Sequence, residues 1–375
     1  MKRTISLILV FSCLISYAFA SSPPPQITSP CSVLMERDTG RILCEKDAHK
    51  KLPPASVTKV MTLLLVMEAL DSGSIKLDDT VQVSEHAAGM GGSQVFLAPG
   101  EQMSVDDMLK ATAIASGNDA AVALAEHIAG SEDGFVALMN KRAKELGMND
   151  TTFKNCTGLD IAGHETSAYD IALMSRELIK HKKIRDYTTT WMDSLRGGAF
   201  QLANTNKLIR SYNGITGLKT GSTSVAKFCL SATAERNGME LIATIMAAPS
   251  SKERFADAAK LLDFGFANFA IYNAGTENIP DDIPVTLGTS DKVSLKFDGN
   301  ASVLTEKANI SSITSELELP DCVNAPVEKG QKIGTLKIIF DNETLSEVNI
   351  VSRDSIPKLG AGGVFCRMLN IIFMK

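Results

Sequence analysis

The apolar positions in the first part of the chain predict a region of mixed helices and strands. Residues 57–70 form an almost unbroken apolar stretch, which predicts a buried helix of about four turns. Residues 228–234 and 239–247 are two apolar runs separated by Glu-Arg-Asn-Gly, and this spacing predicts a β-hairpin. A helix over residues 254–264 is expected to close the region.

Small and polar residues mark turns and helix starts in the same region. Residues 32–47 predict a hairpin with Gly40 in its turn. Ser104, which two aspartates follow closely, predicts the start of a helix. The helical pattern breaks at residues 116–118, and a further helix is expected over residues 119–129.

From Asn273 to Ser352 the pattern changes to short alternating runs divided by glycine, aspartate and asparagine turns. The expected strands are residues 284–287, 292–297, 332–340 and 346–351. Several short strands at such spacing indicate a small β-domain.

The last residues predict a helix at a membrane surface. Pro357 and the glycines of residues 360–363 form a linker, and residues 364–375 are mostly apolar. Arg367 and Asn370 lie one turn apart on one side, so an amphipathic helix in the membrane interface is expected rather than a membrane span. The alternative is a terminal helix that packs on its own protein.

The first 20 residues have the pattern of an export signal. Lys2 and Arg3 give a positive start, residues 5–15 are an apolar run, and Ala18-Phe19-Ala20 matches a cleavage site. A membrane anchor is the weaker alternative, because the apolar run is shorter than the ~20 residues that a spanning helix needs. We therefore expect an exported protein.

Composition and charge exclude several other classes of protein. The 375 residues are 44% apolar and 22% charged, which is typical of a globular protein and not of a disordered, collagen-like or coiled-coil chain. The net charge of -5 means that the chain lacks the excess of positive charge that is typical of proteins that bind nucleic acid. Five histidines, none in an H-E-x-x-H pattern, offer little material for a metal site.

The seven cysteines are interpreted mostly as packing residues, because a chain of this length can fold on an apolar core. Cys31 and Cys44 lie on the two arms of the first hairpin. A three-residue turn would place Cys44 opposite Leu34, so no disulfide is predicted there.

Three short motifs carry the candidate chemistry. The first, Ser56-Val57-Thr58-Lys59, places a hydroxyl and an amine on one face of a helix. A serine needs a base to become a nucleophile, and a lysine can be that base if burial and nearby positive charge lower its pKa. The motif alone is weak, because Ser56 could also be a helix N-cap. The same S-x-x-K spacing also occurs at Ser224/Lys227 and Ser355/Lys358.

The second and third motifs are Ser116-Gly117-Asn118 and Lys219-Thr220-Gly221. The second lies where two helical patterns meet, where serine and asparagine are often caps, and its S-x-N spacing recurs at Ser211/Asn213. The third occurs once and opens a strand whose edge could pair with an extended peptide. Its alternative is an ordinary strand with an exposed lysine.

In this order, the three motifs resemble those of the active-site serine penicillin-binding proteins and β-lactamases. Further segments narrow the resemblance to the low-molecular-mass D-alanyl-D-alanine carboxypeptidases: residues 33–40, 54–59, 91–93, 116–120 and 217–223. The resemblance covers roughly residues 28–272. It implies an α+β fold in which an antiparallel sheet flanked by helices joins a helical subdomain, followed by a small β-rich domain and an amphipathic helix.

The resulting division of the chain has four parts. They are a signal peptide (1–20), a catalytic domain (21–272), a β-domain (273–355) and a linker with a membrane-anchor helix (356–375).

The resemblance also implies catalytic roles. Ser56 would attack the carbonyl between two terminal D-alanines, with Lys59 as general base. Ser116 would relay a proton to the leaving D-alanine, and Asn118 would bind the peptide amide. Lys219 would supply positive charge beside them.

The remaining implied contacts hold the substrate. Thr220 and Thr223 would help to hold its carboxylate beside Gly221, and the backbone N–H groups of Ser56 and Ser222 would form the oxyanion hole. Arg254 stands where these carboxypeptidases have a carboxylate-binding arginine. A solvated arginine is the alternative.

The chain departs from the wider pattern at three places. Gly117 fits this family better than the aspartate usual in class A β-lactamases. Residues 158–166 lack the E-x-x-L-N pattern that those enzymes need for deacylation, and Glu165 is the nearest acid. Ser222 stands where several relatives have histidine.

We therefore expect an exported serine D-alanyl-D-alanine carboxypeptidase at the extracytoplasmic face of the cell membrane. It would trim the pentapeptide stems of peptidoglycan through an acyl-enzyme and be inhibited by β-lactam antibiotics. No metal or organic cofactor is implied, and no nucleic acid partner. The alternatives are a DD-endopeptidase, a β-lactamase and a non-catalytic wall-binding protein.

Overall fold

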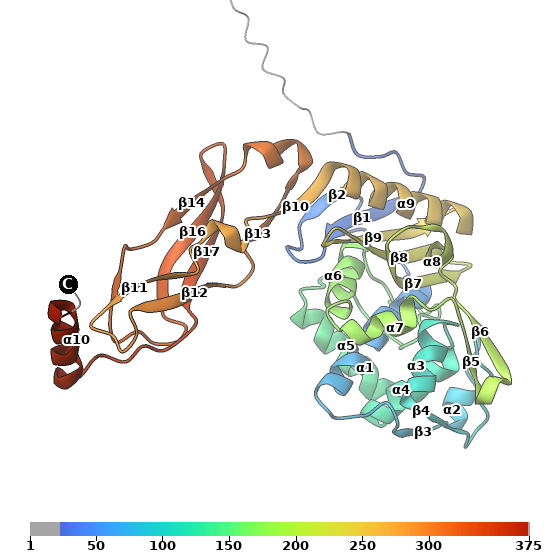
Figure 1. Ribbon diagram of the computed structural model, residues 1–375. Helices are drawn as coiled ribbons and strands as arrows, with labels where there is room; N and C mark the ends of the chain where they lie inside the picture. Colours follow the sequence, from blue (N-terminus) through green and yellow to red (C-terminus); the bar gives the residue numbers. More distant parts are fainter. Residues whose placement is uncertain (1–22, 374–375) are drawn as a thin grey trace, which may run out of the picture.

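The computed structural model describes residues 23–373 of the chain. The predicted export signal lies outside the described residues. Two separate sheets organise the molecule, and Figure 1 shows them side by side with the terminal helix at the far end of the second.

The first sheet has five antiparallel strands in the order β2-β1-β9-β8-β7. The strands are β1 (Cys31–Glu36), β2 (Ile42–Lys46), β7 (Ile215–Thr223), β8 (Lys227–Arg236) and β9 (Met239–Ala248). Both predicted hairpins are confirmed. Strand β7, which contains the Lys-Thr-Gly motif, is an edge strand, so one side of its backbone is not paired within the sheet.

Side chains alternate between the two faces of this sheet and build two cores. Val33 and Met35 pack toward the helical region, whereas Leu34 between them packs against α9 (Ser251–Asn268). Figure 1 shows α9 along one face and the other helices beyond the opposite face. The period of two in the apolar pattern thus gives the sheet its two helical layers.

The helical region contains the predicted buried helix and four further long helices. They are α1 (Lys59–Asp71), α3 (Val105–Ala113), α4 (Asn118–Ala129), α5 (Glu132–Glu145) and α6 (Ala168–Leu178). Three short helices are α2 (Glu85–Ala88), α7 (Arg185–Thr188) and α8 (Leu208–Ser211). Two small hairpins are β3 (Thr80–Gln82) with β4 (Gln102–Ser104), and β5 (Met192–Leu195) with β6 (Phe200–Ala203).

The polar residues mark the helix starts as predicted. The Ser104 hydroxyl accepts a hydrogen bond from the backbone N–H of Asp107 at 3.1 Å and caps α3. The predicted break at residues 116–118 is the sharp joint between α3 and α4, where Ser116 adopts a φ of +64°.

The second sheet has six strands in the order β14-β16-β17-β12-β11-β15. They are β11 (Asp282–Thr286), β12 (Lys292–Asp298), β14 (Thr314–Glu318), β15 (Val323–Asn324), β16 (Lys332–Phe340) and β17 (Glu343–Ser352). The sheet has its own core, in which Leu336, Ile338 and Ile350 are fully buried. All four predicted strands are present.

A two-stranded ladder joins the two parts of the molecule. Strand β10 (Phe269–Asn273) follows α9 directly and pairs with β13 (Ser302–Glu306). Neither strand was expected from the sequence pattern. After the second sheet, helix α10 (Ala361–Phe373) ends the described chain. None of the helices within residues 23–373 is long and apolar enough to cross a membrane.

The first hairpin has the predicted register, with Cys44 opposite Leu34. Within the part of the chain that the structure describes, the thiols of Cys31, Cys44, Cys156 and Cys229 are free. The prediction that Cys31 and Cys44 form no disulfide is confirmed.

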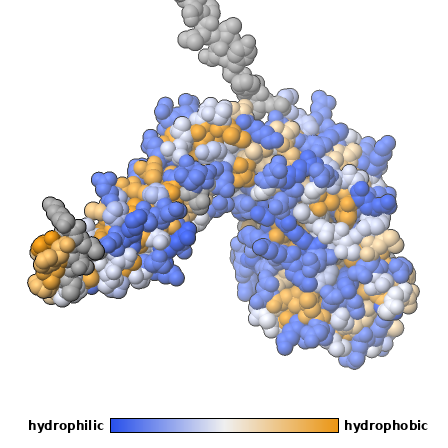
Figure 2. Space-filling view, in the orientation of Figure 1, coloured by the Kyte–Doolittle hydropathy of each residue, from blue (hydrophilic) through white to orange (hydrophobic). Residues whose placement is uncertain are grey.

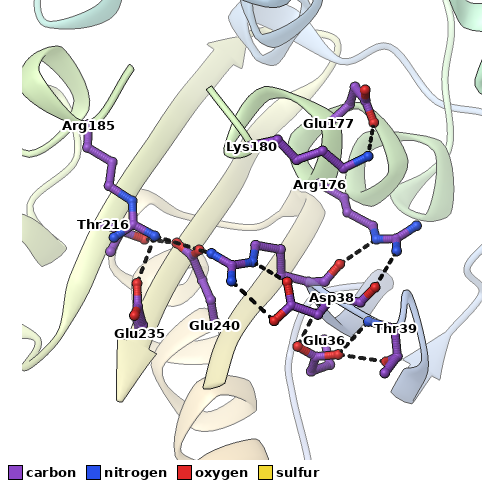
Figure 3. A network of polar contacts seen from close by, with 11 residues as sticks. Glu36, Asp38, Thr39, Arg176, Glu177, Lys180, Arg185, Thr216, Glu235 and Glu240 are labelled. Carbon is purple, nitrogen blue, oxygen red and sulfur yellow. Dashed lines mark hydrogen bonds and ion pairs between the residues drawn. The ribbon is translucent and has the colours of Figure 1, made fainter. Parts of the chain in front are cut away.

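A polar network fixes the end of the first sheet where β7 begins (Figure 3). The fully buried carboxylate of Glu240 accepts hydrogen bonds from Arg37, Arg185 and the Thr216 hydroxyl, each at 2.7 Å. Thr216 lies three residues before Lys219 on the edge strand. Loss of a donor would leave a buried carboxylate short of partners, which is costly, so the network holds the start of β7 in place.

Candidate active site

Ser56 and Lys59 meet at the start of the long buried helix. Ser56 lies in a 3₁₀ turn (Ala55–Thr58) that leads into α1. Pro54 occupies the N-cap position of this turn, so the alternative that Ser56 is an N-cap is wrong. The Lys59 side chain is fully buried, and its Nζ lies 3.1 Å from the Ser56 Oγ.

Two further contacts orient the Lys59 amine. Its Nζ lies 2.5 Å from the Asn118 Oδ1 and 2.8 Å from the Thr157 carbonyl oxygen. Both oxygens can only accept, so they take the two N–H groups of a neutral amine. The remaining lone pair then faces the Ser56 hydroxyl, which is the geometry a general base needs.

Burial makes the neutral amine available. Desolvation lowers the pKa of Lys59 to about 7, and the nearby Cys156 and Asp119 only partly oppose this effect. A large fraction of Lys59 is therefore unprotonated near neutral pH and can accept the proton of Ser56.

A second lysine and serine face each other across the site. The Lys219 Nζ donates to the Ser116 Oγ at 2.8 Å and to the Thr220 carbonyl at 3.0 Å. Lys219 is 1% exposed, so the alternative of an exposed lysine is wrong. Burial lowers its pKa well below the usual value, and the positive charges of Lys59 and Arg254 add to this.

Asn118 connects the site to the loop of residues 91–97. Its Nδ2 donates to the Gly91 carbonyl at 2.6 Å, and its backbone N–H donates to the Ser93 carbonyl at 2.7 Å. The buried Asp119 carboxylate accepts from the backbone N–H groups of Val95 and Leu97. The loop is thus fixed as one wall of the site.

Two glycines allow close approach to the turn that carries Ser56. A Cβ at Gly221 would lie 2.8 Å from the backbone nitrogen of Ser56, and one at Gly158 would lie 1.8 Å from the Ala55 carbonyl oxygen. No side chain fits at either place. Gly221 therefore brings the edge strand, and with it the backbone of exposed Ser222, against the start of the Ser56 turn.

The two threonines of the third motif have different surroundings. The Thr220 hydroxyl, 4% exposed, donates to the Thr205 hydroxyl at 2.6 Å. The Thr223 hydroxyl donates to the Asp160 carboxylate at 2.9 Å and accepts from the Ala226 N–H at 2.9 Å. A second carboxylate beside Asp160 would be repelled, so this contact opposes the carboxylate-holding role expected for Thr223.

Arg254 is 7% exposed, so the alternative of a solvated arginine is wrong. Its guanidinium donates to the carbonyl oxygens of Gly221 at 3.0 Å and Cys229 at 3.3 Å, and its buried Nε has no partner. Burial lowers its pKa to about 10. The arginine thus lies directly against the motif strand with one donor unused.

The other occurrences of the motif spacings lie on the surface. Ser224 and Lys227 are exposed, as are Ser355 and Lys358, and as are Ser211 and Asn213. The structure therefore brings together Ser56, Lys59, Ser116, Asn118 and Lys219, and it leaves the chance matches outside.

Sequence reasoning assigned no role to three contributors. Thr157 supplies the carbonyl that orients Lys59, Asp119 fixes the loop of residues 91–97, and Gly158 packs on the turn that carries Ser56. Asp119 directly follows the second motif, which is the only local signal that could have found it.

Comparisons with known proteins find similar sequences along almost the whole chain. The family model for D-alanyl-D-alanine carboxypeptidase matches residues 18–250, and that for the C-terminal domain of penicillin-binding protein 5 matches residues 266–358. D-alanyl-D-alanine carboxypeptidase DacF of Bacillus subtilis is 44% identical over 96% of each chain. DacC of Escherichia coli is 34% identical over 94% of this chain and 89% of that protein.

Solved structures show the same likeness. Penicillin-binding protein 5 from Haemophilus influenzae superposes with a TM-score of 0.73 and 32% identity over 90% of this chain and 100% of that one. Penicillin-binding protein 6B from Escherichia coli has a TM-score of 0.72 and 32% identity over 88% of this chain and 96% of that one.

Proposed function

We propose the function of this protein from one premise: the chain belongs to the D-alanyl-D-alanine carboxypeptidase family. Membership confirms the resemblance predicted from the three motifs, and the solved relatives confirm the predicted fold class. The protein is a serine-type carboxypeptidase that removes the terminal D-alanine from peptidoglycan stem peptides. The observation that carries this proposal is the contact of a buried Lys59, with a pKa of about 7, and the Ser56 hydroxyl at 3.1 Å.

The reaction begins with the two residues of the first motif. Lys59 takes the proton of Ser56 while the serine oxygen attacks the carbonyl carbon between the two D-alanines. The backbone N–H groups of Ser56 and Ser222 stabilise the negative charge that develops on the carbonyl oxygen. Gly221 supports this role, because its missing side chain lets the edge strand reach the turn of Ser56.

The second motif completes the acylation. As the peptide C–N bond breaks, the Ser116 hydroxyl gives its proton to the leaving amine and receives in turn the proton that Lys59 took from Ser56, so Lys59 becomes neutral again. Lys219 at 2.8 Å orients the Ser116 hydroxyl. D-Alanine departs and the rest of the stem remains as an ester of Ser56. Water, deprotonated by Lys59, then hydrolyses the ester and restores the serine.

The substrate lies between the edge strand and Asn118. The Asn118 amide binds the peptide carbonyl that precedes the reacting bond, and Lys219 and Thr220 lie on the side of the terminal carboxylate. Thr223 is left out of this set, since its hydroxyl already donates to Asp160. The free edge of β7 offers backbone groups to the extended peptide.

β-Lactams react at the same serine, so a labelled penicillin tests the proposal. We expect one equivalent of covalent label per chain, followed by slow release. A non-catalytic wall-binding protein would take up none. The Glu165 carboxylate faces Lys51 at 4.0 Å, and only the backbone of Glu165 pairs with Thr152. This supports a carboxypeptidase over a β-lactamase with an acid poised for deacylation.

Arg254 is proposed to bind the free carboxylate of the substrate. Its unused Nε and its contact with Gly221 support this. Arg254→Ala should lower turnover of an acyl-D-Ala-D-Ala peptide by roughly 10- to 150-fold, the loss of a charge-assisted bond worth about 1.5 to 3 kcal/mol. Turnover of the C-terminally amidated peptide should fall much less. Equal losses on both peptides, with Arg254→Lys behaving like Arg254→Ala, would show that the arginine only supports the strand.

Helix α10 is proposed to hold the enzyme on the outer surface of the cell membrane. Four of its large apolar side chains are exposed, Phe365, Met368, Ile372 and Phe373, and their spacing puts them on one face. Figure 2 shows this hydrophobic end of the molecule far from the catalytic region. The division into catalytic domain, β-domain and anchor, and export by residues 1–20, are part of the same proposal.

Removal of residues 361–375 tests the anchor. The truncated enzyme should leave the membrane fraction, and its D-alanine release from a soluble peptide should stay within about twofold of the full chain, because α10 packs on none of the catalytic elements. Sedimentation of the truncated chain with membranes, or loss of its activity, would make α10 part of the fold.

A further inference from the structure

A cavity of about 320 Å³ opens beside the end of the catalytic strand. Its walls include Pro53, Asp160, Ile161, His164, Glu165 and Val225. None of these residues takes part in the chemistry proposed above. We name this cavity the side-chain pocket.

The side-chain pocket lies beside the catalytic machinery. Thr223, the last residue of β7, donates to Asp160, and Val225 lies in the turn that follows. Pro53 lies three residues before Ser56. The loop that carries Asp160 also gives the Thr157 carbonyl to Lys59, so a single loop supports the base and forms the pocket wall.

The charges of the site give the bound peptide a direction. Lys219 contacts Ser116 and Thr220 at one part of the strand, whereas Asp160 contacts Thr223 at its end. A terminal carboxylate is repelled by Asp160, so it lies on the side of Lys219 and of the Arg254 guanidinium, away from the end of the strand. The residues that precede D-Ala-D-Ala therefore pass the end of the strand, next to the side-chain pocket.

The lining matches one kind of side chain. Ile161 and Val225 are 54% and 61% exposed, so they offer apolar surface to an alkyl chain. Asp160 and Glu165 supply two carboxylates at the same pocket. An alkyl chain that ends in an ammonium group satisfies both features.

The other charged groups near the side-chain pocket leave room for such a cation. Lys51 faces Glu165 at 4.0 Å, with both side chains about half exposed, and a pair of this kind is weak enough for a ligand to replace. The side chain of Lys154 also lies near the pocket, since a Cβ at Gly163 would be 3.5 Å from the Lys154 Cε. His164 is uncharged near neutral pH, because burial lowers its pKa to about 4.

We propose that the side-chain pocket binds the side chain of the residue that precedes D-Ala-D-Ala and selects a free aliphatic amine there, as in a diamino acid. The inference rests on the proposed carboxypeptidase function and deepens it. The enzyme then prefers stems whose side-chain amine has not been converted into an amide cross-link.

The test compares three peptides that differ only at this residue: acyl-Lys-D-Ala-D-Ala, its Nε-acetyl form, and the norleucine analogue. We expect kcat/KM for the free lysine to exceed that for each of the others by roughly 5- to 20-fold at low salt, since a partly exposed charged contact is worth less than a buried one. High salt should reduce this preference.

The variants Asp160→Asn and Glu165→Gln keep the shapes of the two acids, and the amide oxygen that replaces the Asp160 carboxylate can still accept from Thr223. Each should reduce the preference for lysine over norleucine at least threefold, whereas Asp78→Asn, at an acid outside the pocket, should not. Equal kcat/KM for all three peptides in an enzyme that takes up penicillin and releases D-alanine would overturn the pocket alone. Failure of those two activities would overturn the carboxypeptidase function instead.

Discussion

Ser56→Ala is expected to abolish covalent labelling by penicillin and to lower D-alanine release by about four to six orders of magnitude, because the acylated oxygen is gone. The fold should persist. Pro54 and not Ser56 is the N-cap of the 3₁₀ turn, so loss of the Ser56 hydroxyl should cost at most about 1 kcal/mol of stability. Intact-protein mass spectrometry after penicillin treatment, with circular dichroism as the check of folding, measures both results.

Ser224→Ala is the matched control for this experiment, since Ser224 begins another S-x-x-K segment but is exposed. It should take up penicillin like the unchanged protein. Label on Ser224 or Ser355, or label retained by a folded Ser56→Ala chain, would refute the assignment of the nucleophile.

The second large effect concerns Lys59. Replacement by methionine should lower the acylation rate by about 10²- to 10⁴-fold, the usual contribution of a general base. The pH dependence of acylation by the unchanged enzyme tests the same role independently and needs no variant. The proposed base is the neutral amine of Lys59, whose pKa is about 7 because the side chain is buried.

The sign of the pH dependence follows from this charge state. Below the pKa Lys59 is protonated and cannot accept from Ser56, so the rate of acylation should fall about tenfold per pH unit there and level off above it. Stopped-flow measurement with a labelled penicillin between pH 5 and 9 gives the profile. A rate that is flat across pH 7, or one that rises only near the ordinary lysine pKa, would remove Lys59 from the role of base.

Local sequence predicted the elements that carry the site better than the contacts within it. The turn around Gly40 determined the register of Cys44 and Leu34, and Ser104 marked the start of a helix, because turn and capping chemistry depend on neighbouring residues. The motif order also pointed to Ser56 and Lys59, whose side chains lie 3.1 Å apart in the structure.

Contacts between distant segments could not be predicted in the same way. The Thr157 carbonyl meets Lys59 across 98 positions of sequence, and nothing in the residue type of Thr157 marks it for that place. For Thr223, the motif suggested a hydroxyl that binds the carboxylate of the substrate. In the fold this hydroxyl donates to the carboxylate of Asp160, which lies in another loop.

The second sheet shows the same limit for secondary structure. Its long strands alternate clearly, and they were predicted. Strand β14 is exposed at nearly every position, and β15 has two residues, so neither carries a readable alternation. Outside this sheet, strand β10 was also missed. It lies before the expected boundary at residue 273, and its pairing with β13 depends on residues far along the chain.

The most direct test of the central claim is the release of free D-alanine from a soluble acyl pentapeptide that ends in D-Ala-D-Ala. The purified chain should release one D-alanine per peptide and leave the tetrapeptide, and the Ser56→Ala chain should release none above background. Rapid hydrolysis of penicillin without any D-alanine from the pentapeptide would contradict the account and identify a β-lactamase on the same fold.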